Sequence, residues 1–172
     1  MEDIVSEEVT FKGKPVTLIG HHAKVGNKAR DFTVLANDLS PVTFGDSAHK
    51  IRVINVVFSL DTSLCDAQTR RFNEALTGLS DKIEVITISM DLPFAQARWC
   101  GSAGIENVKT YSDHRDALFG VAFGVLIKEL RLLARAVFVV DESNTIRYVE
   151  YVPEVTSHPN YEAAIQAVKS LL

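Results

Sequence analysis

Residues 51–79 read IRVINVVFSLDTSLCDAQTRRFNEALTGL and contain two different hydrophobic patterns. Ile51 to Val57 is a run rich in β-branched residues, which is typical of a strand buried on both faces. After this run, apolar residues recur at the spacing of one helix face: Phe72, Ala75, Leu76 and Leu79. A second strand-like run follows at Ile83 to Met90. This strand, helix, strand order predicts an α/β protein whose sheet contains parallel strands.

The segments on either side extend this pattern. Val9 to Leu18 alternates around Lys12-Gly13-Lys14, which predicts an N-terminal β-hairpin. Five further features are expected along the chain: a strand at Phe32–Leu35, a short helix from Pro93 to Cys100 ended by Gly101, helical structure within Ala117–Leu133, an antiparallel pair formed by Ala136–Asp141 and Thr145–Val152, and a C-terminal helix over Asn160–Leu172.

Length and composition predict one domain over residues 1–172. The chain has 172 residues, of which 47% are hydrophobic and 23% charged, enough to bury one core. Its net charge of -4, with no lysine or arginine cluster, argues against nucleic acid as a partner. The most apolar segments, Val53–Leu60 and Ala134–Val140, are strand-sized, so no membrane span is expected.

Cellular location and cofactor binding are predicted from signals and motifs that are missing from the sequence. Met1 to Thr10 carries four acidic residues and no basic one, unlike a secretory signal. With only two cysteines this favours the cytoplasm, while export after removal of a signal stays open. The five histidines have no metal-ligand spacing, and no glycine-rich phosphate loop is present. We therefore expect no metal and no bound cofactor.

Cys65 is the candidate nucleophile because it falls in the first turn of the helix expected after the first long strand. Asp61 or Thr62 is placed to cap that helix, whose free N–H groups and dipole favour an anionic sulfur. The Thr62 hydroxyl, three residues earlier, is within reach of the sulfur or of a substrate oxygen. The alternative is that Cys65 is a small core residue, since free cysteine is often buried.

Ionisation alone does not make a thiol fast, because a less basic thiolate is also a weaker nucleophile. The larger rate gain must come from donors to the leaving atom. Arg135 is a candidate donor, since a guanidinium at the start of the buried run Ala136–Val140 needs an anionic partner. That partner is either the Cys65 thiolate or a carboxylate in a structural ion pair.

Cys100 is the second candidate redox residue. It lies thirty-five positions after Cys65, so the two could share one end of the sheet. Spacing alone does not establish pairing, and Cys100 could instead be a helix-end residue that packs beside Trp99.

Five motifs along the chain are distinctive: Ser59–Cys65, Gln68–Glu74, Ser89–Gln96, Arg98–Cys100 and Leu132–Val139. Together they closely resemble the thiol peroxidase branch of the atypical two-cysteine peroxiredoxins. The resemblance covers nearly the whole chain. It implies a thioredoxin-like fold of the peroxiredoxin type with an N-terminal β-hairpin, usually in a homodimer.

The resemblance also implies a mechanism. Cys65 would be the peroxidatic cysteine and Cys100 the resolving one, while Thr62 and Arg135 fall on the family's active-site threonine and arginine. Cys65 would reduce hydrogen peroxide and organic or lipid hydroperoxides and become a sulfenic acid. Condensation with Cys100 would give an intramolecular disulfide, which thioredoxin would reduce. A disulfide requires Cα atoms within about 7 Å, so local unwinding is expected if the helices hold the cysteines apart.

The chain departs from the family pattern at two positions. Phe58 stands seven residues before Cys65, where the family has proline, and Arg30 stands where proline is common. Phenylalanine adds bulk and an N–H that proline lacks. This keeps a redox sensor or interaction protein with a blunted pocket as an alternative. A general thiol-disulfide oxidoreductase is a further alternative, although the chain lacks C-x-x-C.

Overall fold

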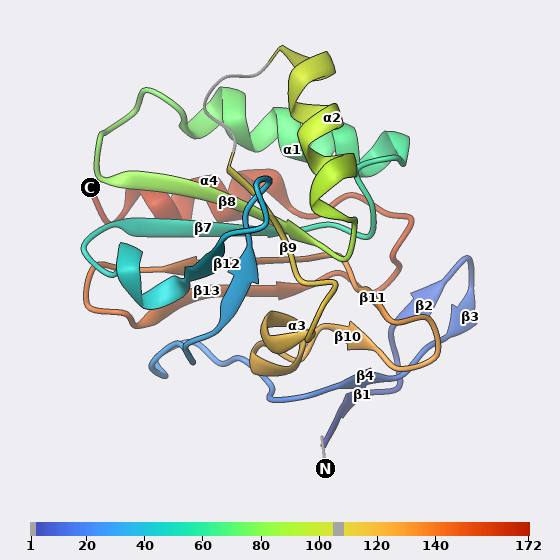
Figure 1. Cartoon of the computed structure of the whole chain (residues 1–172). Coiled ribbons are helices and arrows are strands. Elements are labelled where there is room, and N and C mark those ends of the chain that lie inside the picture. Colours follow the sequence, from blue (N-terminus) through green and yellow to red (C-terminus); the bar gives the residue numbers. More distant parts are fainter. Residues whose placement is uncertain (1–2, 105–108) are drawn as a thin grey trace.

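The computed structural model, which describes residues 3–104 and 109–172, is built around a seven-stranded mixed sheet (Figure 1). In spatial order the strands are β13 (Ile146–Tyr151), β12 (Ala136–Val140), β7 (Ile51–Val56), β8 (Ile83–Ser89), β9 (Lys109–Ser112), β5 (Thr33–Leu35) and β6 (Pro41–Thr43). Strands β7, β8 and β9 run parallel, while β12 pairs antiparallel with both β7 and β13. The predicted parallel strands and the predicted antiparallel pair near the C-terminus are both confirmed.

Four helices flank this sheet. They are α1 (Ser63–Leu76), α2 (Pro93–Ala103), α3 (Leu118–Ala122) and α4 (Tyr161–Lys169). Helices α1 and α4 cover the same face, where Phe72 and Val168 pack on Val53 and Val137 of the sheet. Asn160 caps α4 by accepting a hydrogen bond from the backbone N–H of Ala163 at 3.1 Å. No helix within the two described ranges has the length and apolarity needed to cross a membrane.

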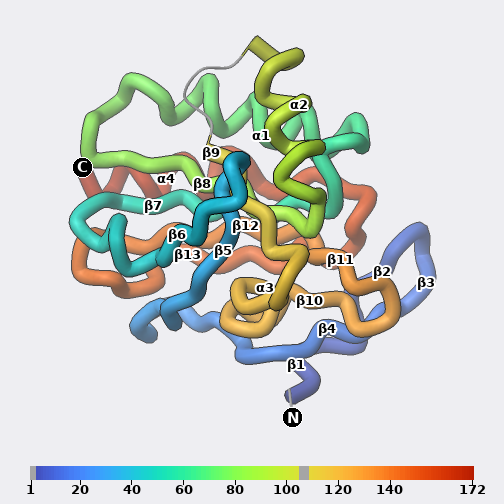
Figure 2. Tube along the Cα trace, in the orientation of Figure 1, coloured from blue at the N-terminus to red at the C-terminus, as the bar shows by residue number. Residues whose placement is uncertain are grey.

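The other face of the sheet is covered by the N-terminal region and by the segment around α3. A four-stranded sheet lies there, in the order β1 (Ile4–Ser6), β4 (Leu18–Ile19), β10 (Leu126–Ile127) and β11 (Leu132–Leu133) (Figure 2). A 3₁₀ turn, Phe44–Ser47, adds to this side. Five aromatic rings fill the space between: Phe32, Phe44, Phe119, Phe123 and Phe138. The central strands are therefore buried on both faces, which explains their continuous apolar pattern.

The N-terminal hairpin is confirmed as β2 (Thr10–Phe11) and β3 (Lys14–Pro15). Its two turn residues, Lys12 and Gly13, have φ of 53° and 80°, as a two-residue turn between right-twisted strands requires. Glu154 fastens this hairpin to the body of the protein. Its carboxylate accepts hydrogen bonds from the Thr10 hydroxyl at 2.9 Å and the Gly13 N–H at 2.8 Å.

Two expected helix boundaries are wrong, and a third segment is helical only in part. Helix α2 continues past Gly101 to Ala103 and ends at Gly104, whose φ of 65° is the left-handed conformation that stops a helix. Helix α1 ends at Leu76, so Leu79 is exposed and does not extend the apolar face. Within 117–133 only Leu118–Ala122 is helical, because the chain then turns into the short strands β10 and β11.

The Glu154 contacts predict an acid-sensitive attachment of the hairpin. Hydrogen bonds from Thr156, and then from Gly13 and Thr10, lower the pKa of Glu154 from 4.5 to about 2. This stabilisation is complete above about pH 4.5 and is lost as the pH falls toward 2. We expect Glu154→Gln to lower the melting temperature at pH 7 by about 3 °C, the shift produced by about 1 kcal/mol in a chain of this size.

The measurement is thermal unfolding followed by circular dichroism between pH 7 and pH 3. The gap between wild type and Glu154→Gln should narrow as the pH falls. The exposed Glu142→Gln is the matched control and should melt with wild type throughout. A gap that is independent of pH would contradict this role for the carboxylate.

Candidate active site

Cys65 is the third residue of α1, which begins after the loop 57–62 that follows β7. Thr62 is the N-cap, so the Cys65 N–H is among the first ones of the helix, which have no partner inside it. The side chain is 0% exposed and packs with Val57, Leu60 and Trp99. The thiol therefore sits in a mainly apolar pocket at the positive end of a helix dipole.

Two N–H donors reach the sulfur inside this pocket. The Arg135 Nη1 lies 3.3 Å from Cys65 Sγ, and the backbone N–H of Ser59 lies 3.5 Å from it. Arg135 is itself 2% exposed, and its Nε donates to the Val155 carbonyl at 2.8 Å. Across the described part of the chain, Arg135 forms no ion pair with a carboxylate. Of the two partners that the sequence left open, the sulfur is the one it contacts.

A chain of buried amides fixes the guanidinium. Gln68 accepts a hydrogen bond from Arg135 Nη1 at 2.7 Å and donates through its own amide to Asn55. Asn55 in turn donates to the hydroxyls of Thr69 and Thr87, each at 3.1 Å. Sequence reasoning missed Gln68 and Asn55, although a polar residue inside the apolar run of β7 was the available signal.

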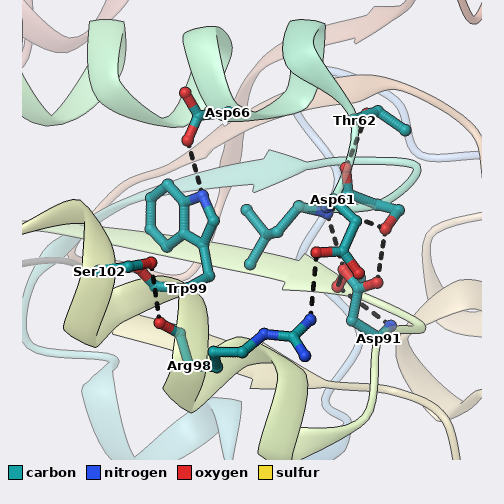
Figure 3. A network of polar contacts seen from close by, with 10 residues as sticks. Asp61, Thr62, Asp66, Asp91, Arg98, Trp99 and Ser102 are labelled. Carbon is teal, nitrogen blue, oxygen red and sulfur yellow. Dashed lines mark hydrogen bonds and ion pairs between the residues drawn. The ribbon is translucent and has the colours of Figure 1, made fainter.

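Asp91 fixes the loop that carries the second donor. Its carboxylate accepts from the Ser59 hydroxyl at 2.6 Å, the Leu60 N–H at 2.8 Å and the Ser89 hydroxyl at 2.6 Å (Figure 3). These bonds link the loop after β7 to the end of β8. They hold the Ser59 N–H toward Cys65, so Asp91 is a third residue whose role sequence reasoning missed.

Thr62 lies at the exposed edge of the site. Its hydroxyl donates to the Ser59 carbonyl at 2.7 Å, and it makes no hydrogen bond to the helix that it precedes. The oxygen keeps its capacity to accept a hydrogen bond from a molecule that enters from solvent.

Cys100 lies in the second half of α2 and is half-buried. Both cysteines are free. The Cys100 Sγ lies 3.3 Å from the Thr110 hydroxyl on β9, and its side chain also packs against the apolar cluster around Cys65. The structure thus brings the two thiols to one end of the sheet in the dithiol state, each with its own polar partner.

The two residues that depart from the expected pattern lie in different surroundings. Phe58 is half-buried and stacks on Phe11 of the N-terminal hairpin, with ring centroids 4.9 Å apart. It contacts both the cluster around Cys65 and the cluster under the hairpin. Arg30 is exposed and lines a surface cleft with His22 and Lys28.

Comparison with known proteins agrees with this geometry. The family profile described as Redoxin matches residues 24–165. A thiol peroxidase of Halalkalibacterium halodurans is 62% identical over 164 residues, covering 95% of this chain and 98% of that protein. A thiol peroxidase of Bacillus subtilis is 60% identical over 165 residues, covering 96% and 98%. The crystal structure of a peroxiredoxin-like protein from Aquifex aeolicus superposes with a TM-score of 0.90 at 41% identity, covering 97% and 98%. The chain, with its thioredoxin-like fold, therefore belongs to the thiol peroxidases of the redoxin family.

Proposed function

We propose that this thiol peroxidase reduces hydroperoxides through a sulfenic acid on Cys65 and a Cys65–Cys100 disulfide. The observation that carries the proposal is the buried Arg135 guanidinium, 3.3 Å from Cys65 Sγ. A guanidinium stays protonated, and burying it without an anion is costly. Since no carboxylate pairs with Arg135 in the described ranges, a Cys65 thiolate supplies the compensating charge.

In the first step the thiolate attacks the terminal oxygen of the hydroperoxide. A sulfur–oxygen bond forms and the oxygen–oxygen bond breaks, which leaves Cys65 as a sulfenic acid. The departing alkoxide or hydroxide takes a proton from water. Arg135 and the Ser59 N–H are already aimed at the sulfur, so they stabilise the charge that moves across the breaking bond. Thr62 serves as the polar group that meets the peroxide at the exposed edge.

In the second step the Cys100 thiol condenses with the sulfenic acid, forming the disulfide and releasing water. A dithiol reductant then restores both thiols, and we propose thioredoxin for this role. We also propose that the chain acts as one domain, assembles as a homodimer and works in the reducing cytoplasm, where thiols stay reduced until peroxide arrives. Relatives named thiol peroxidase support an enzyme over a redox sensor with a blunted pocket.

Single substitutions should distinguish the roles of the two cysteines. We expect Cys65→Ser to abolish consumption of hydrogen peroxide coupled to thioredoxin, because no sulfenic acid forms. Cys100→Ser should consume about one equivalent of peroxide and then stop, because the sulfenic acid has no resolving thiol. Peroxide consumption measures that single equivalent, and NADPH oxidation with thioredoxin and thioredoxin reductase measures turnover.

A parallel assay replaces thioredoxin by dithiothreitol. Activity in that assay but not with thioredoxin would reject the reductant and keep the peroxidase. Unchanged steady-state turnover of Cys65→Ser in either assay would refute the assignment of the nucleophile.

Arg135 should act through its geometry as well as its charge. Arg135→Lys keeps the charge, but one ammonium does not reproduce the bonds to Val155, Gln68 and the sulfur. We expect the rate constant for oxidation of Cys65 by hydrogen peroxide to fall about a hundredfold, the usual cost of losing one donor to developing charge. Stopped-flow oxidation in a Cys100→Ser background measures this step alone.

The matched control is Arg147→Lys. Arg147 is a half-exposed arginine on β13 that pairs with Asp141. It should leave the rate constant unchanged. Equal rates for wild type and Arg135→Lys would show that the charge alone is sufficient.

A further inference from the structure

In the reduced structure the two sulfur atoms have polar partners from different strands of the sheet. Cys65 Sγ contacts Arg135, which immediately precedes β12, whereas Cys100 Sγ contacts Thr110 on β9. A disulfide needs the sulfurs about 2 Å apart. Both cysteines are free in this arrangement, although their side chains pack in the same cluster. The cysteines must therefore shift from these positions before the bond forms.

Side chains, rather than close backbone packing, connect the two cysteine helices. The backbones of α1 and α2 come close at few points. The connection is made next to the cysteines in the sequence, because Asp66 follows Cys65 and Trp99 precedes Cys100. The Trp99 Nε1–H donates to Asp66 Oδ1 at 2.7 Å (Figure 3).

The other groups around this hydrogen bond hold it in place. Arg70 Nε donates to the second oxygen of Asp66 at 2.9 Å, and its guanidinium carbon lies 5.8 Å from the Trp99 ring centroid. Arg70 Nη1 also reaches the Ala103 carbonyl near the end of α2 at 3.4 Å. Trp99 is 8% exposed, so its ring is enclosed by these contacts and by the cluster that contains Cys65. Moving Cys100 toward Cys65 strains this set of contacts first, because Trp99 is its direct neighbour.

We propose that the Asp66–Trp99 hydrogen bond holds α1 and α2 in the reduced arrangement and thereby limits the rate at which Cys100 reaches oxidised Cys65. The inference rests on the proposed function. Asp66 and Trp99 are positioning residues, since neither gains or loses a bond or a proton in the reaction, although Trp99 packs in the cluster that contains Cys65. Their effect is on the fate of the sulfenic acid.

The sulfenic acid has two competing fates. In resolution, Cys65–SOH and the Cys100 thiol form a disulfide and release water. In over-oxidation, a second hydroperoxide transfers an oxygen atom to Cys65–SOH, which gives the sulfinic acid and an alcohol or water. Resolution does not depend on peroxide concentration, but over-oxidation does. A tighter connection between the helices therefore increases the share of Cys65 lost as sulfinic acid at high peroxide.

The test is Trp99→Phe, which keeps an aromatic ring in the cluster but removes the N–H donor together with part of the ring volume. A hydrogen bond to a charged group typically changes an equilibrium by about tenfold or more. We expect disulfide formation to be about tenfold faster and the sulfinic fraction per turnover to fall by a similar factor. Both are measured by acid quench and mass spectrometry after mixing with a range of hydrogen peroxide concentrations.

A second variant keeps the test valid if Trp99→Phe folds poorly. Asp66→Asn retains an acceptor oxygen but loses the charge, so a smaller acceleration is expected. Trp99 is the chain's one tryptophan, and in this variant its fluorescence follows resolution directly. The matched control is Arg98→Gln, which removes the exposed pair with Asp61 at 3.4 Å beside Trp99. Exposed pairs contribute little, so this variant should resolve at the wild-type rate.

The outcomes distinguish a failure of this inference from a failure of the proposed function. Suppose that Cys65 oxidises normally in both test variants. If disulfide formation in both is then slower than in wild type, or within twofold of it, the inference is overturned and the proposed function is not. Equal acceleration in Arg98→Gln would also overturn it, because any loosening of α2 would then suffice. If wild-type Cys65 does not form a sulfenic acid, the proposed function itself fails.

Discussion

The site depends on one buried charge. Arg135 lies in the protein interior and makes its hydrogen bonds to a backbone carbonyl, an amide and a sulfur. Such a cation is costly unless an anion stands beside it. In the proposed mechanism the Cys65 sulfur is that anion, so the same contact would compensate the guanidinium and supply the reactive thiolate. The apolar wall around Cys65 strengthens this interaction by keeping water away from it.

The fold brings these groups together from distant parts of the sequence. Cys65 and Arg135 are 70 residues apart, and Arg135 and Gln68 are 67 apart. They meet because β12 lies next to β7 and because α1 follows β7 after the short loop 57–62. The parallel pairing of β7 and β8 then places Asp91 beside the loop after β7. The order of the strands thus brings the backbone segments of the site together, and side-chain hydrogen bonds fix the final positions of its groups.

The sequence predicts the parts of this arrangement that have a strong local signal. The apolar runs of β7 and β8 identify the central strands, and the Lys12-Gly13 turn identifies the hairpin, because each pattern follows from backbone geometry alone. The two-residue strands β10 and β11 lie in a segment expected to be helical, since a strand so short has no periodicity to detect. Gly101 is inside α2 although it was expected to end it, because a glycine ends a helix only where φ becomes positive. Gln68 and Asp91 escaped prediction for a related reason: their roles depend on partners that only the tertiary structure supplies.

The N-terminal hairpin reaches the active site by two routes. Thr10 exchanges backbone hydrogen bonds with Pro153 and Val155, each at 2.8 Å, and the same Val155 uses its carbonyl to hold Arg135. On the other side, Phe11 stacks on Phe58 in the loop that leads to Cys65. Phenylalanine at position 58 thus provides a contact that a proline ring, smaller and not aromatic, would not provide in the same form. The hairpin is therefore a support for both donors of the site, since one route fixes the guanidinium and the other fixes the segment that carries the Ser59 N–H.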